Sequence, residues 1–189
     1  SGLAQPADPL RDIAAESSEL STQIVDAEAA LGHRLAELAG LQREKRDLDE
    51  RMHWVERRAA VHALGQEFAK TLTRFLHQLP AAERFAAASE RNARLLAEAS
   101  DSELGVALAL SELEDLDAAT ARRLAAWSPP LPPEQATPPG SEVHAALAEQ
   151  RHLLKRLATV QAKHLRVLHQ TEEEGRDLQT DPYGAEYIT

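Results

Sequence analysis

The sequence contains no cysteine. Disulfide bonds, thiolate metal sites and thiol nucleophiles are therefore excluded, while the redox compartment stays open. Strand-forming residues are also scarce, because valine and isoleucine together occupy ten of the 189 positions and aromatic residues make up only 4%. This composition argues against a fold built on β-sheets.

Long apolar runs and an excess of positive charge are missing as well. The richest short apolar window, 104–116, is interrupted by four polar residues, whereas a membrane span needs about 18 or more consecutive apolar residues. The 31 acidic residues outnumber the 21 basic ones and give a formal net charge of −10. Such a charge supplies no general attraction to phosphate backbones or anionic lipid. We therefore expect neither nucleic-acid binding nor membrane insertion.

Helix-forming residues are abundant. Alanine and leucine fill 35 and 28 positions, and both favour helices. Six of the ten prolines lie in one stretch, 128–140, and a helix interior does not tolerate such a stretch. It is predicted to be a linker. Together with Pro80 it divides the chain into predicted helices at 10–79, 81–127 and 141–178.

The first helix is predicted to be a long coiled-coil arm. Apolar residues recur mostly at spacings of three and four, the seam pattern of coiled coils, at Leu20, Ile24, Ala27, Leu31, Leu38, Leu41, Leu48, Met52, Val55 and Ala59. Arg34, Lys45 and His62 interrupt the seam, and each either extends its stem to water, pairs across helices or marks the end of a partner helix. At about 1.5 Å per residue, a helix over 10–63 would be roughly 80 Å long, so an elongated shape is expected.

Two positions leave the continuity of the helices open. Beyond Gly65 the apolar phase shifts, so the first helix either continues with a stutter or kinks there, and we expect it to continue to residue 79. Residues 100–103 (Ser-Asp-Ser-Glu) match a capping box, which either starts a new helix or forms a polar patch on a continuous one.

The second and third helices each carry an apolar stripe. In the second it is predicted at Leu104, Leu108, Leu113, Leu116, Leu124 and Trp127, beside an acid-only segment that we expect to face solvent. In the third it is predicted at Val143, Leu147, Leu154, Leu157, Val160, Leu165 and Leu168. Three helices bury such stripes by packing antiparallel. The fold prediction is a single all-α domain over 1–189, an elongated antiparallel bundle or coiled coil of three long helices.

Two Glu-x-x-His pairs, Glu50 with His53 and Glu149 with His152, have the spacing used in di-iron bundles. At this spacing both side chains share a helix face. However, 21 glutamates and eight histidines in this chain give about one such pair by chance. The seam also places Met52 inward, which turns Glu50 and His53 toward solvent. We predict no metal site and no cofactor.

Catalytic signatures are missing from the sequence too. It has no Gly-x-Ser-x-Gly, P-loop or His-Glu-x-x-His motif, and long helices do not aim side chains at one point as loops do. We therefore expect no enzyme activity and no catalytic residues. Trp54 and Trp127 are interpreted as packing anchors rather than ligand-stacking groups. The basic pairs at 57–58 and 122–123 are interpreted as surface charge.

The chain resembles the amino-terminal extracytoplasmic helical region of the large MscS-type mechanosensitive channels, the MscK-like branch. Residues 64–66 (Leu-Gly-Gln), leading to residues 79–80 (Leu-Pro), resemble the end of that region's long first helix. Residues 108–116 (Leu-Ala-Leu-Ser-Glu-Leu-Glu-Asp-Leu) resemble its leucine-rich stretch, and residues 150–157 (Gln-Arg-His-Leu-Leu-Lys-Arg-Leu) the opening of its third helix. Residues 179–189 would then be a run-up to a membrane region.

The resemblance implies a non-enzymatic periplasmic domain of an inner-membrane ion channel, acting as a spacer, lever or interaction module that modulates gating. Its partner would be the membrane part of the same chain, within a homo-oligomer that the resemblance makes heptameric, while the isolated fragment could be monomeric. Residues 2–6 (Gly-Leu-Ala-Gln-Pro) match the small-residue end of a secretory signal, which agrees with that location.

Two other functions remain open from the sequence. A self-contained coiled-coil scaffold or adaptor would use the seam of the first helix to pair with another chain. An extracytoplasmic ligand-sensing bundle of a receptor would instead hold a small solute in a pocket between helices.

Overall fold

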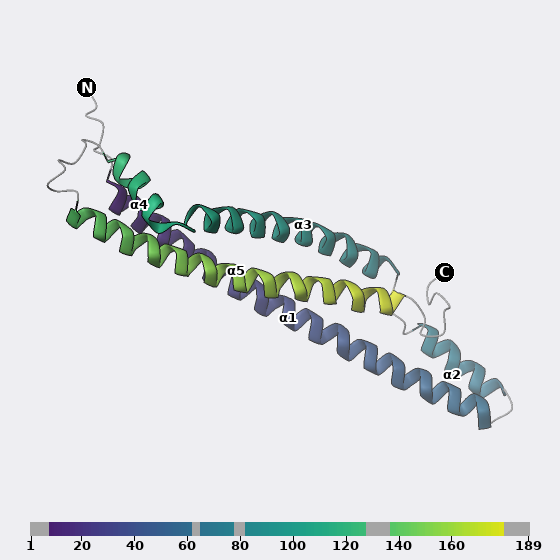
Figure 1. The fold of residues 1–189 in the computed structure, drawn as a ribbon. Helices are drawn as coiled ribbons and strands as arrows, with labels where there is room; N and C mark the ends of the chain where they lie inside the picture. Colours follow the sequence, from purple (N-terminus) through teal and green to yellow (C-terminus); the bar gives the residue numbers. More distant parts are fainter. Residues whose placement is uncertain (1–7, 62–64, 78–81, 128–136, 180–189) are drawn as a thin grey trace. The chain divides into compact units, whose positions relative to one another are not determined.

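The computed structural model describes residues 8–61, 65–77, 82–127 and 137–179 (Figure 1). Over these residues the chain is helical and has no strand, so the predicted all-α class is confirmed. The helices are α1 (Pro9–Val61), α2 (Gln66–His77), α3 (Ala82–Glu112), α4 (Leu116–Ala125) and α5 (Thr137–Gln179). None of them, over the described residues, combines the length and apolarity needed to cross a bilayer.

The chain divides into two compact units that share the three longest helices. Unit 1 comprises Ser1–Leu31 and Ala99–His164, and unit 2 comprises Gly32–Glu98 and Leu165–Thr189. The expectation of one domain over 1–189 stays a prediction.

Unit 1 is built around a hydrophobic core to which α1, α3, α4 and α5 contribute. The core residues are Ile13, Ile24, Val106, Leu113, Ala119, Val143, Leu147, Leu154 and Leu157. Helices α3 and α5 run in opposite directions here, because Ser102 meets Gln161 while Leu113 meets Arg151 further back along α5. The short helix α4 lies beside the first turns of α1 and α5 (Figure 1).

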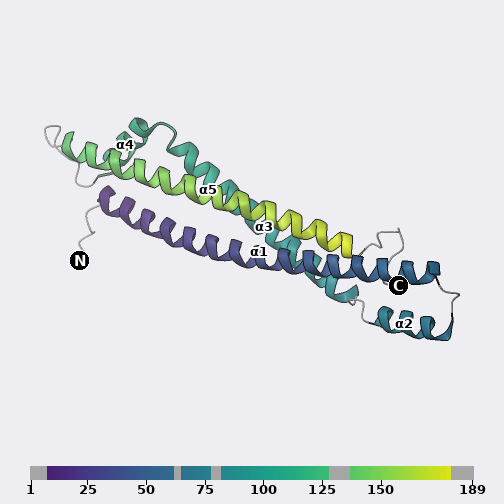
Figure 2. The ribbon, with the colours of Figure 1, turned by 90° about the horizontal axis from the view of Figure 1, so that it is seen from below.

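In unit 2, α2 folds back beside the last turns of α1 (Figure 2). The end of α5 is joined to α3 by buried Asn92, whose side-chain nitrogen donates a hydrogen bond to the carbonyl of Leu168 at 3.1 Å. Leu168 itself is fully buried, and Leu38 of α1 is 6% exposed. The segments of α1, α3 and α5 that belong to this unit therefore each bury part of one face.

The first helix is shorter than predicted. It begins at Pro9, where the Asp8 carboxylate accepts hydrogen bonds from the backbone N–H groups of residues 10 and 11, and proline suits the first helical position. It ends at Val61, and α2 begins only after non-helical Gly65. The predicted continuation to residue 79 is therefore wrong, because Gly65 is not helical and a new helix begins at Gln66. His62 and Pro80 lie outside the described residues.

The second predicted helix is also interrupted, but not near Ser100. Helix α3 runs through residues 100–103, so this capping box is a polar patch on a continuous helix. The interruption lies at residues 113–115, where Asp115 caps α4 by accepting a hydrogen bond from the N–H of Ala118 at 3.0 Å. An aspartate at this position satisfies an otherwise unpaired helix donor and so fixes the new start.

The third helix begins earlier than predicted. Helix α5 starts at Thr137 rather than at residue 141, and its first turn contains both prolines of the pair at 138–139. Prolines are tolerated in the first turn because the N–H groups there have no helical partner. The rest of the predicted linker, 128–136, and the predicted run-up from residue 180 onward lie outside the described residues.

The predicted seams of α1 and α5 are confirmed. On α1, Ile24 and Leu38 are buried and the other seam residues up to Val55 are half-buried, whereas Ala59 is exposed. On α5, every residue of the predicted stripe is buried except Leu165, which is half-buried. A spacing of three and four therefore identified the packed face of both helices.

The predicted stripe of α3 is wrong at two positions. Leu104 and Leu108 are 60% and 59% exposed. The packed face of α3 instead contains Ser102, Val106 and Ala109, and Leu113, which the predicted stripe included, is buried just beyond the end of the helix. These four residues also follow a spacing of four, three and four, so α3 offered two competing stripes, and contact with α5 selected the less leucine-rich one.

This difference predicts opposite outcomes for two leucine substitutions. Leu147→Ala should lower the free energy of unfolding by about 2–5 kcal/mol, because Leu147 is fully buried and its loss leaves a cavity. Leu108→Ala should change it by less than about 0.5 kcal/mol, since the side chain is exposed and both residues favour helices. Urea unfolding followed by circular dichroism measures both values, and a large loss for Leu108→Ala would contradict the observed face of α3.

Candidate functional site

The best-connected polar cluster in unit 1 joins α1, α4 and α5. Both guanidinium nitrogens of Arg123 donate to the Glu16 carboxylate, at 3.0 and 2.7 Å. The side-chain nitrogen of Gln150, a buried residue on α5, donates to the same carboxylate at 2.7 Å. One carboxylate thus receives a bidentate ion pair from α4 and an amide hydrogen bond from α5, an arrangement that fixes how the three helices face each other.

The cluster holds Glu16 in its charged form. Partial burial alone would raise the pKa of Glu16, but the hydrogen bonds from Arg123 and Gln150 and the charge of Arg123 outweigh it, so the pKa is lowered. The lowered pKa keeps the Glu16 carboxylate ionised at neutral pH, where it accepts these hydrogen bonds. Its role is better described as structural pairing than as acid–base chemistry.

A groove of about 440 Å³ opens beside this cluster. Its apolar part is formed by Leu20, Ala109, Leu113, Ala119, Leu147 and Leu154, and its polar part by Glu16, Glu19, Gln23, Glu112, Arg122, Arg123 and Gln150. Both arginines are engaged, because Arg122 donates to the carbonyl of Glu112 at 2.9 Å and Arg123 pairs with Glu16. The charges that remain along the groove are carboxylates.

Unit 2 contains a second cavity, of about 490 Å³, lined by α1, α3 and α5. Five of its charged residues pair among themselves: Arg34 with Glu37 at 2.7 Å, Arg91 with Glu37 at 3.8 Å, and Arg176 with Glu172 at 2.8 Å. Gly40 and Gly175 line it from α1 and α5, and a Cβ atom added at either would meet nothing within 4 Å. The hollow therefore exists because small residues occupy positions where larger ones would fit.

Two of the three residues that interrupt the α1 seam are explained by ion pairs. Lys45 pairs across helices, because it binds Glu174 and Asp177 of α5 at 3.3 and 2.8 Å. The hydrogen bond to Asp177 is the largest cause of the raised pKa of Lys45, and Glu174 raises this pKa further. Arg34 pairs within its own helix, with Glu37, beside the unit 2 cavity. The sequence had left cross-helix pairing open as one of three explanations.

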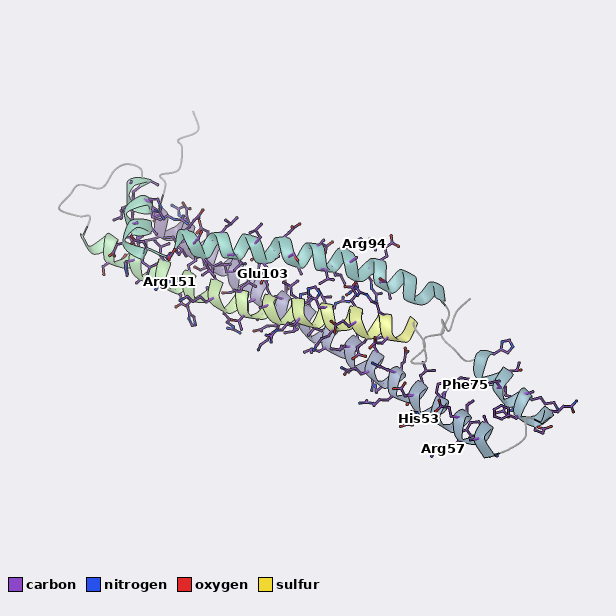
Figure 3. All side chains as sticks on the ribbon, turned by 45° about the vertical axis from the view of Figure 1, so that its right-hand side comes forward. His53, Arg57, Phe75, Arg94, Glu103 and Arg151 are labelled. Carbon is purple, nitrogen blue, oxygen red and sulfur yellow. The ribbon has the colours of Figure 1, made fainter. Side chains whose placement is uncertain are left out.

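The two Glu-x-x-His pairs fall in different units. His53, labelled on α1 in Figure 3, is exposed, and its Nδ1 atom lies 2.8 Å from the carbonyl of Asp49 in the same helix. Glu149 and His152 on α5 are exposed as well. Over the described residues, no three acidic or histidine side chains come together as metal ligands would.

The tryptophans and basic pairs have local partners. Trp127 packs against the core of unit 1. Trp54 is 40% exposed, and the Arg58 guanidinium lies over its ring at 5.2 Å from the centroid, within the range of a cation–π contact. Arg122 and Arg123 bind groups of unit 1 as described above, so this pair contributes to packing as well as to surface charge.

The sequence prediction missed the residues that form the Glu16 cluster. Gln150 lies on the α5 stripe, three residues after Leu147, and a polar residue on a packed stripe signals a buried hydrogen bond. Ile13, one heptad before Leu20, is 1% exposed and extends the α1 seam further than predicted. Glu16 follows Ile13 by three residues, so the extended seam would have brought it to notice.

Comparison of the chain with family models, with curated proteins and with solved structures finds no match.

The Glu16 cluster predicts a pH-dependent contribution to stability. Because the folded pKa is lowered, the contribution is present above the ordinary carboxyl pKa of about 4.3 and is lost as pH falls through the lowered value. Glu16→Gln should lower the free energy of unfolding by about 1 kcal/mol at pH 7, a modest loss because the ion pair is partly exposed. The difference from the parent should shrink as the medium is acidified.

Chemical unfolding at pH 7 and at acidic pH measures this difference. Glu19→Gln is the matched control, since Glu19 lies along the same groove and has a single weak partner in the described chain, Gln23 at 3.5 Å. It should cost less than about 0.5 kcal/mol at either pH. An equal loss for Glu16→Gln at both pH values would contradict the ionic role of Glu16.

Proposed function

We propose that this chain is a non-enzymatic helical module: the extracytoplasmic, periplasmic domain of an MscS-type mechanosensitive channel in the inner membrane. In this proposal its long helices act as a spacer or lever that modulates gating. The channel assignment is supported by the sequence resemblance at residues 64–66, 108–116 and 150–157. The mechanical role is supported by the way the helices are fastened to each other.

The observation that carries the mechanical role is lateral fastening at intervals along α5. In unit 1, Glu16 and Glu28 of α1 bind Gln150 and Arg156 of α5 at 2.7 and 2.9 Å. In unit 2, Lys45 of α1 binds Glu174 and Asp177 of α5. Polar side chains are thus used to bind neighbouring helices rather than to surround a reaction centre.

The same contacts support an elongated antiparallel bundle of three long helices as the finer description of the fold. In unit 1, pairing of residue 16 with 150 and of 28 with 156 makes α1 and α5 run in the same direction. Pairing of 102 with 161 and of 113 with 151 makes α3 run opposite to α5. In unit 1 the segments of α1, α3 and α5 thus alternate in direction, as in an up-down-up bundle.

In a channel, such a module would act through differential contacts. A domain shifts an open–closed equilibrium only if it interacts differently with the two states. Helices that are laterally fastened transmit a displacement at one end instead of absorbing it by local bending. The proposed partners are the membrane part of the same chain and the other copies of a homo-oligomer, which the resemblance makes heptameric.

Electrical recording of the full-length gene product tests this proposal. Its reading frame should encode several membrane-spanning segments beyond residue 189. In bacterial spheroplasts without other mechanosensitive channels, deletion of residues 8–179 should shift the tension threshold or the inactivation of the current. Unchanged gating, a frame without membrane spans, or a stable dimer of the chain at micromolar concentration, as a coiled-coil scaffold would give, would count against the channel assignment.

A second candidate function, ligand sensing, is favoured by the unit 2 cavity. Its volume of about 490 Å³ falls within the range of small-molecule sites. The cavity combines apolar walls with paired charges at Arg34 and Arg91, so a small zwitterionic or dicarboxylic solute is its best-matched occupant.

Thermal unfolding in the presence of a panel of amino acids and dicarboxylates tests the sensing function. A ligand should raise the melting temperature of the parent by about 2 °C or more at concentrations well above its Kd. Gly40→Leu with Gly175→Leu fills the hollow and should remove the shift, while Gly32→Leu, in the same helix but outside the cavity lining, should not. If no solute stabilises the parent, or the filled variant responds equally, sensing at this cavity is ruled out.

A further inference from the structure

The acid-only segment of unit 1 carries most of the chain's net charge. Residues 99–121 include six carboxylates, Asp101, Glu103, Glu112, Glu114, Asp115 and Asp117, and no lysine, arginine or histidine. Residues 99–121 therefore have a formal charge of −6, compared with −10 for the whole chain. Asp115 is committed to capping α4. In the described chain, the carboxylates of Asp101, Glu103, Glu112 and Glu114 enter no ion pair.

Two large apolar side chains lie within this segment and are not covered. Leu104 and Leu108 are one helical turn apart, so they share a face of α3, and they are 60% and 59% exposed. Gly105 and Ala107 beside them are too small to shield them. The buried side of the same turn is occupied by Val106, so the two leucines are surplus to the core of unit 1.

The exposed leucines continue into the groove of unit 1. Leu104, Leu108 and Glu112 succeed one another at intervals of four residues, which places them in one row along α3. Glu112 lines the groove, together with Ala109 of α3 and Glu19 and Leu20 of α1. We call Asp101, Leu104, Leu108 and Glu112 the acidic α3 face. It presents an apolar ridge between two carboxylates that have no ion pair among the described residues, and it lies next to an open groove.

We propose that the acidic α3 face is a docking surface for an amphipathic basic helix of a partner protein. Apolar side chains of that helix cover Leu104 and Leu108, and its lysines or arginines meet Asp101 and Glu112. Helices commonly dock by laying an apolar face on a partner surface through positions spaced by three and four. The inference concerns unit 1 alone and holds whether or not the chain belongs to a channel.

The charge of the surface argues against two other occupants. A second copy of this chain would bring the same carboxylates against each other, and like charges facing across an interface are strongly unfavourable. An anionic membrane surface would be repelled for the same reason. A basic partner gains both the apolar contact and the charge complementarity, which also speeds its association at low salt.

Binding of a designed helical peptide to the full 189-residue chain tests the proposal. The probe is a fluorescently labelled 18-residue peptide of leucine and lysine with leucines spaced by three and four. A peptide of the same composition in shuffled order controls for charge alone. Fluorescence anisotropy should show that the amphipathic peptide binds the parent chain more tightly than the shuffled one does, with an affinity that falls as salt is raised.

Matched variants locate the binding. Leu104→Gln with Leu108→Gln keeps two good helix formers on an exposed face and should weaken binding about tenfold or more. Asp101→Asn with Glu112→Gln should weaken it several-fold and flatten its salt dependence. Val25→Gln is the control, because Val25 is 63% exposed on α1 of the same unit and is not part of the groove lining. Circular dichroism melting confirms that each variant folds like the parent.

Several results would overturn the proposal. They are equal binding of both peptides, no binding to the parent, or unchanged binding by the leucine variant. Sedimentation that shows the parent to be a dimer, and the leucine variant a monomer, would assign the face to a second copy. Binding to phosphatidylglycerol vesicles that the leucine variant loses would assign it to a membrane.

Discussion

The structure of unit 1 depends on the burial of one side of α5. Val143, Leu147 and Leu157 are at most 2% exposed and touch a core to which α1, α3 and α4 also contribute. Each fully buried aliphatic side chain stabilises the fold by about 1.5–3 kcal/mol, whereas a partly exposed ion pair contributes about 1 kcal/mol or less. Apolar burial therefore supplies the stability, and polar pairs such as Glu16 with Arg123 select which helix faces which.

The sequence was informative wherever one periodic stripe had no rival. The seams of α1 and α5 were predicted because large apolar residues recur at helical spacing and most of the remaining positions are polar or alanine. On α3 two stripes compete, one through Leu104 and Leu108 and one through Val106 and Ala109, and hydrophobicity favours the wrong one. Capping signals compete in the same way, since residues 100–103 and Asp115 both mark a possible start and only Asp115 is used.

The candidate sites were less accessible to sequence reasoning because their partners are distant along the chain. Glu16 and Gln150 are 134 positions apart, and Lys45 and Asp177 are 132 apart. A polar residue on an apolar stripe indicates that a hydrogen-bond or ion-pair partner is required. The spacing of residues along one helix does not identify that partner. The unit 2 cavity could not be predicted from the sequence for the same reason. Gly40 and Gly175 line one cavity only once α1 and α5 are packed together.

The two buried glutamines of α5 have a consequence for sliding. Gln150 donates to Glu16 and Gln161 donates to Ser102 at 2.7 Å each, so α5 is registered against α1 and α3 at two heights. A shift of α5 by one helical turn would preserve much of the apolar contact. It would leave both side-chain amides buried without hydrogen-bond partners, at a cost of about 1–3 kcal/mol each. Under an axial load, a purely aliphatic α5 would slide along its neighbours one helical turn at a time. The α5 of this chain resists such sliding until the hydrogen bonds of both glutamines are broken.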